Sequence, residues 1–136
     1  MATAAASSGI NTRGTTTLTD CLVEDNSAEV RGGGLEINGG TTTLTGSTRV
    51  RGNHADTNVS SAGGGIFING GTLVIAETYL VTENTAASGN GGGIRNSGGT
   101  VTLQGANPSP IVVNNCHENC VGSVPQCAAT PISCPP

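Results

Sequence analysis

The sequence has almost no aromatic residues, with one Phe, one Tyr and no Trp among 136 residues. An ordinary two-layer domain buries much of its apolar area through such side chains, so their scarcity argues against a conventional globular core. Charged residues make up only 10% of the chain, and the five basic ones are all arginines. Five scattered arginines and a net charge of −4 do not form the basic face that nucleic-acid binding requires.

Long apolar segments are also missing, since no run approaches the roughly 18 residues of a membrane-spanning helix. Residues 1–8 lack the basic and apolar segments of a secretory signal peptide. We expect them to form a flexible amino-terminal segment ahead of a single domain.

Glycine is abundant, with 22 residues, and much of it lies in a repeat. Glycine triplets precede an aliphatic residue at 32–35, 63–66 and 91–94, and a degenerate copy begins at Gly9. The interval of roughly 25 to 31 residues is typical of solenoid proteins, which stack one structural unit upon another.

Each unit continues into a threonine-rich segment in which apolar residues alternate with polar ones, and it closes on an aliphatic-x-x-Asn motif. Alternation with a period of two is typical of strands, and the Thr and Gly content disfavours helices. The sequence therefore predicts an all-β fold. We expect a right-handed parallel β-helix of about four to five rungs over residues 9–115.

Stacked units would place equivalent residues above one another in ladders. Two aliphatic ladders are predicted in the interior: Ile10, Leu35, Ile66 and Ile94, and Leu18, Leu44, Ile75 and Leu103. An asparagine ladder is predicted from the closing motifs: Asn26, Asn53, Asn84 and Asn114. Each of its amides would hydrogen-bond to the next one at a bend.

Four of the five cysteines lie in the Pro-rich residues 116–136: Cys116, Cys120, Cys127 and Cys134. Their spacing does not fit a zinc ribbon, so two disulfides are favoured over a metal site, with three pairings open. We expect a disulfide-linked cap at the carboxyl-terminal end, and a protein that is secreted or displayed at a cell surface. Cys21 stands apart and is expected to be a small core or wall residue of the first rung rather than a reactive thiol.

The glycine triplet followed by V-x-x-N resembles the repeats of chlamydial polymorphic outer membrane proteins. It is more similar to the GGGI, GGTLTLT and VSGN repeats of large secreted bacterial β-helix proteins with pectate-lyase-like folds. The resemblance covers roughly residues 9–115. The positions that correspond to Phe of the chlamydial repeat are Val23, Val50, Val81 and Ile111. The resemblance implies a β-helix fold and a surface location.

The only acidic cluster consists of Asp20, Glu24 and Asp25, which the strand pattern does not bring into a convergent pair. We therefore expect no catalytic, cofactor-binding or metal-binding residues, and no enzymatic activity. The favoured function is a structural or adhesive surface module. Self-association or continuation into a larger β-helix is expected at the uncapped amino-terminal end.

Two alternatives remain open. A pectate-lyase-like fold can bind or process polysaccharides, so a glycan or another surface ligand is a possible partner. The outward column of Thr17, Thr43 and Thr102, which Val74 interrupts, resembles the threonine arrays of ice-binding β-helices.

Overall fold

The computed structural model describes residues 9–55, 62–76, 81–86, 91–104, 112–116, 118–125 and 127–128. Within these ranges every regular element is a β-strand, and no helix could cross a membrane. The expected flexible segment, residues 1–8, lies outside the described residues.

The strands follow one another in four similar units. The first unit contains β1 (Ile10–Thr12), β2 (Thr15–Thr19), β3 (Leu22–Glu24) and β4 (Ser27–Ala28). The second contains β5 (Leu35–Thr45), β6 (Arg49–Arg51) and β7 (His54–Ala55). The third contains β8 (Ile66–Ala76), β9 (Val81–Thr82) and β10 (Thr85–Ala86). The fourth contains β11 (Gly91–Asn96), β12 (Thr100–Gln104) and β13 (Val112–Val113), and β14 (Glu118–Val121) follows.

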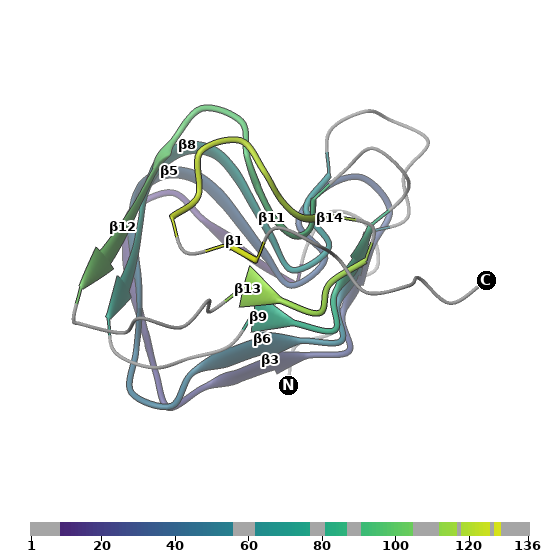
Figure 1. Ribbon diagram of the computed structural model, residues 1–136. Coiled ribbons are helices and arrows are strands. Elements are labelled where there is room, and N and C mark those ends of the chain that lie inside the picture. Colours follow the sequence, from purple (N-terminus) through teal and green to yellow (C-terminus); the bar gives the residue numbers. More distant parts are fainter. Residues whose placement is uncertain are drawn as a thin grey trace.

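Equivalent strands of successive units pair in parallel and form three sheets (Figure 1). The first sheet has the order β1-β5-β8-β11-β14, with β2 and β12 paired to β5 and β8. The second has the order β13-β9-β6-β3, and the third has the order β10-β7-β4. The protein is therefore a parallel β-solenoid, as the repeat predicted.

The chain makes about three turns between Ile10 and Ile94. It passes four times through the first sheet on this path, and β14 adds a fifth strand above β11. The sequence predicted about four to five rungs, whereas the structure shows a solenoid of about three turns.

The interior is built from columns of aliphatic side chains. On the first sheet Ile10 pairs with Leu35, Leu35 with Ile66, and Ile66 with Ile94. A second column contains Leu18, Leu44, Ile75 and Leu103. The second sheet supplies Val23, Val50, Val81 and Val112. These columns form one core cluster, and the small aliphatic side chains suit a space enclosed by three nearby sheets.

Glycine is required where coils approach each other by their backbones. A Cβ atom on Gly64 would lie 2.4 Å from the carbonyl oxygens of both Gly92 and Thr85. These atoms belong to the main chain and cannot move aside as a flexible side chain could. The glycine triplets therefore allow successive coils to stack closely.

Candidate functional site

An asparagine ladder follows the corner between the second and third sheets. The backbone N–H and Nδ2 of Asn26 both donate to Oδ1 of Asn53, at 3.1 and 3.0 Å. Asn53 donates in the same way to Asn84, at 3.0 and 2.9 Å. Asn84 donates to Asn115, again at 3.0 and 2.9 Å. All four side chains are buried, so the ladder joins the coils internally.

The expectation that Asn114 belongs to this ladder was wrong, because Asn115 occupies the position. Asn114 is exposed and has a φ of 56°. Glu83, which precedes the ladder residue Asn84, is also exposed and has a φ of 57°. The sequence Ile-Val-Val-Asn-Asn fits the closing motif in two registers. Pairing of Val112 with Val81 selects the second register, in which Asn114 takes the left-handed conformation that asparagine tolerates. Ile111 lies outside the described residues.

The ladder continues beyond the expected residues. The backbone N–H and Nδ2 of Asn115 donate to Oδ1 of Asn119, at 2.9 and 3.1 Å. Asn119 in turn donates to the carbonyl oxygen of Ala128 at 3.2 Å. At the other end, Oδ1 of Asn26 is buried and has no hydrogen-bond partner among the residues that the structure describes.

Disulfides link the segment at the carboxyl-terminal end of the solenoid. Cys120 is bonded to Cys127, and Cys116 is also disulfide-bonded, whereas Cys134 lies outside the described residues. Cys120 pairs with Ile94 at the end of the first sheet. This linkage indicates a non-reducing environment. Cys21 is a free thiol, and its Sγ donates to the carbonyl oxygen of Thr19 at 3.2 Å.

The acidic cluster of the first rung is used in contacts between neighbouring coils. Asp20 Oδ1 accepts hydrogen bonds from the backbone N–H and Oγ of Ser47, at 2.8 and 3.1 Å. These hydrogen bonds, the backbone one most of all, lower the pKa of the Asp20 carboxyl below its ordinary value. Glu24 forms an ion pair with Arg51 at 3.2 Å. No group of three or more His, Cys, Asp or Glu within the described ranges could hold a metal ion.

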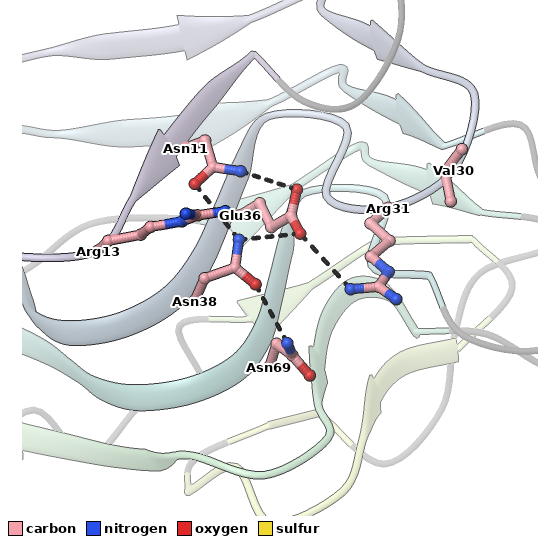
Figure 2. A pocket seen from close by; sticks show the side chains of 7 residues that line it. All are labelled: Asn11, Arg13, Val30, Arg31, Glu36, Asn38 and Asn69. Carbon is pink, nitrogen blue, oxygen red and sulfur yellow. Dashed lines mark hydrogen bonds and ion pairs between the residues drawn. The ribbon is translucent and has the colours of Figure 1, made fainter.

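A polar hollow of about 550 Å³ lies on the outer side of the first sheet (Figure 2). Strands β1, β5 and β8 supply its amides and its carboxylate, and the segment that leads into β5 supplies part of its rim. The lining residues are Asn11, Arg13, Val30, Arg31, Glu36, Asn38 and Asn69.

Glu36 lies in the middle of this hollow and is only 5% exposed. Its Oε2 accepts a hydrogen bond from Nδ2 of Asn11 at 3.2 Å, and its Oε1 accepts one from Nδ2 of Asn38 at 3.1 Å. Nη1 of Arg31 lies 3.8 Å from the same Oε1. The carboxylate is therefore compensated, as a buried charge must be.

The remaining contacts of the hollow leave one cationic side chain without a partner among the described residues. Asn69 donates to Asn38 at 3.2 Å and Asn38 donates to Asn11 at 3.3 Å, which fixes the three amides in one row. Arg31 also lies over the ring of Phe67, 5.3 Å from its centre. The side chain of Arg13 forms no hydrogen bond or ion pair with any part of the chain that the structure describes, and Figure 2 shows it on the opposite side of Glu36 from Arg31.

None of these residues was singled out from the sequence. A signal was present, because Ile-Asn-Gly-Gly recurs at 37–40 and 68–71 and places an outward asparagine before the same bend in two coils. The position of Arg31 carried no such signal, since it depends on the path of an irregular segment.

Comparison with models of protein families, with curated proteins and with solved structures finds no match to this chain.

Proposed function

We propose that the protein is a non-enzymatic adhesive module, secreted or displayed at a cell surface, which binds an acidic polysaccharide in the hollow of the first sheet. The observation that carries this proposal is the guanidinium group of Arg13, which has no partner among the described residues and lies beside a row of asparagine amides and a carboxylate that is already compensated. The disulfides support a location outside the reducing cytoplasm.

The charges of the hollow favour an acidic ligand. Arg13 and Arg31 outnumber the single carboxylate of Glu36 in this hollow, although the whole chain has a net charge of −4. A guanidinium group binds a carboxylate with two parallel hydrogen bonds, and amides bind hydroxyl groups. A uronic acid presents both groups on one ring. The exposed side chain of Val30 at the rim offers an apolar contact for the C–H face of that ring.

The arrangement of acidic groups favours binding over cleavage. Glycoside hydrolysis with a carboxylate pair requires two carboxyl groups within about 5 to 9.5 Å of each other. Glu36 is the one carboxylate among the residues that line the hollow, and both of its oxygens accept hydrogen bonds from asparagines.

We expect the protein to bind oligogalacturonate, and the Arg13→Ala variant to bind it at least about tenfold more weakly, because a charge-assisted contact contributes about 1.5 to 3 kcal/mol. Isothermal titration calorimetry measures both affinities. The matched control is Arg49→Ala, which removes an arginine from the second sheet and should leave binding unchanged.

A second control uses the fully methyl-esterified oligosaccharide, which keeps the sugar rings and lacks their charge. It should bind weakly to every variant. Equal affinity of Arg13→Ala and the unaltered protein, or no binding at all, would contradict the proposal. Release of shorter, unsaturated or reducing products would show processing instead of binding.

We also propose that copies associate through the amino-terminal end of the solenoid. Oδ1 of Asn53 and Oδ1 of Asn84 each accept two hydrogen bonds from the preceding coil, whereas Oδ1 of Asn26 accepts none from any residue that the structure describes. Strands β1, β2, β3 and β4 each have a paired neighbour on one side only within the described residues. Such edges are templates for another strand.

Light scattering over a wide range of protein concentrations tests this association. The mass should rise with concentration, and Leu22→Asp, which adds a charge to the edge strand β3, should reduce the rise. A monomer at every concentration would rule the association out.

A further inference from the structure

Beyond the glycine bend at Gly39 and Gly40, the first sheet presents a second outward surface, which we call the threonine face. It consists of the outward residues of β2, of β12, of residues 41–45 in β5 and of residues 72–76 in β8. One complete column crosses all four coils: Thr15, Thr41, Thr72 and Thr100. The sequence had suggested only the neighbouring, interrupted column.

That neighbouring column contains Thr17, Thr43, Val74 and Thr102. Valine replaces the hydroxyl of threonine by a methyl group, so the shape of the column is preserved at Val74. A third column begins with Thr19 paired to Thr45 and ends with Ala76 paired to Gln104. The face therefore carries no charged and no aromatic side chain, and threonine occupies most of its positions, with Val74, Ala76 and Gln104 at the others.

The backbone fixes these side chains on a regular grid. Strands in a sheet lie about 4.8 Å apart, and alternate residues along a strand lie about 6.6 Å apart. Pairing is continuous from Thr15 to Thr19 against β5, and from Thr100 to Gln104 against β8. Threonine has few side-chain rotamers, and the strands are held from beneath by the fully buried Leu44 and Ile75. The grid is therefore organised before any ligand arrives.

The chemistry of the face restricts the ligand. Nucleic acid would require cations, and soluble sugars or protein partners would favour aromatic or charged contacts, none of which this face offers. A repeating, uncharged grid complements a ligand that also repeats in two dimensions. The oxygen atoms at the surface of ice repeat with spacings of this order. Each threonine hydroxyl both donates and accepts a hydrogen bond there, while its methyl group occupies the space between water molecules.

We propose that the threonine face binds ice. This activity is separate from the binding of acidic polysaccharide, because the hollow and the threonine face use different residues of the same sheet.

Thermal hysteresis and the shape of growing ice crystals test the proposal. The unaltered protein should hold the freezing point below the melting point and produce faceted crystals. Thr43→Tyr places a bulky ring at the centre of the grid and should reduce the hysteresis at least about tenfold, as loss of a central contact does in rigid interfaces. The matched control is Thr82→Tyr, because Thr82 lies on the second sheet and its variant should match the unaltered protein.

Circular dichroism checks that both variants fold. If Thr43→Tyr does not fold, Thr17→Tyr on the edge strand β2 replaces it in the test. Arg13→Ala should retain full hysteresis, and Thr43→Tyr should retain oligogalacturonate binding, so failure of one proposal is distinguishable from failure of the other. Hysteresis no larger than that of a non-binding protein would overturn the inference. Full activity of folded Thr43→Tyr or Thr17→Tyr would also overturn it, as would sedimentation with crystalline cellulose in the absence of any effect on ice.

Discussion

Ile66→Asp should abolish folding of the solenoid. Ile66 is fully buried and lies between Leu35 and Ile94 in the central column of the first sheet. An aspartate there would be ionised without a partner, or would have to take up a proton at the expense of stability. A loss of more than about 4 kcal/mol in the free energy of unfolding is exceptional for a single substitution, and a small domain rarely stays folded after such a loss.

Far-ultraviolet circular dichroism and urea denaturation measure this effect. The variant should lose both its β-sheet signal and its cooperative unfolding transition. The matched control is Leu22→Asp, which makes the same kind of change at a side chain that is 44% exposed and should alter stability by less than about 1 kcal/mol. A cooperative transition of Ile66→Asp near that of the unaltered protein would show that the coil register is different.

Asn115→Ala should lower the free energy of unfolding by about 3 to 5 kcal/mol. The asparagine oxygen accepts two hydrogen bonds from Asn84, and its Nδ2 donates to the carbonyl oxygen of Val81 at 2.8 Å and to Asn119 at 3.1 Å. Truncation leaves several of these buried groups without partners, and each unsatisfied group costs about 1 to 3 kcal/mol.

The neighbouring residue provides the control. Asn114→Gly removes an amide of the same kind from an exposed position with a positive φ, which glycine adopts without strain, and should be nearly neutral. Chemical denaturation of both variants measures the difference. The opposite order of stability would place Asn114 in the ladder and shift the fourth coil by one residue.

The sequence was sufficient for the architecture because the information is repeated in every coil. Glycine triplets, alternating segments and closing asparagines recur at similar intervals, and each copy supports the same assignment. The interior columns of Leu35 and Leu44 follow directly from a period of two. A one-residue ambiguity in the fourth coil was enough to misplace Asn114, because the repetition of Val and Asn allowed two registers.

The polar hollow could not be predicted in the same way. It joins outward residues of three coils to Arg31, which belongs to an irregular segment and whose guanidinium group lies over the ring of Phe67. Outward positions carry no hydrophobic pattern. Which outward side chains lie next to each other therefore follows only from the register in which the strands pair. The complete threonine column likewise could be recognised only from the pairing of Thr72 with Thr41 and with Thr100. The pair of Thr41 and Thr72 comes just after a register irregularity in β5, which the sequence did not indicate.

We propose that the hollow around Glu36 receives an acidic sugar chain. Nuclear magnetic resonance of the 15N-labelled protein during titration with oligogalacturonate tests it most directly. We expect the side-chain amide signals of Asn11, Asn38 and Asn69 and the guanidinium signal of Arg13 to shift together with one saturation curve, while those of Asn53 and Asn84 inside the ladder stay in place. Shifts confined to residues outside the hollow, or a spectrum that does not change at saturating ligand, would contradict the account.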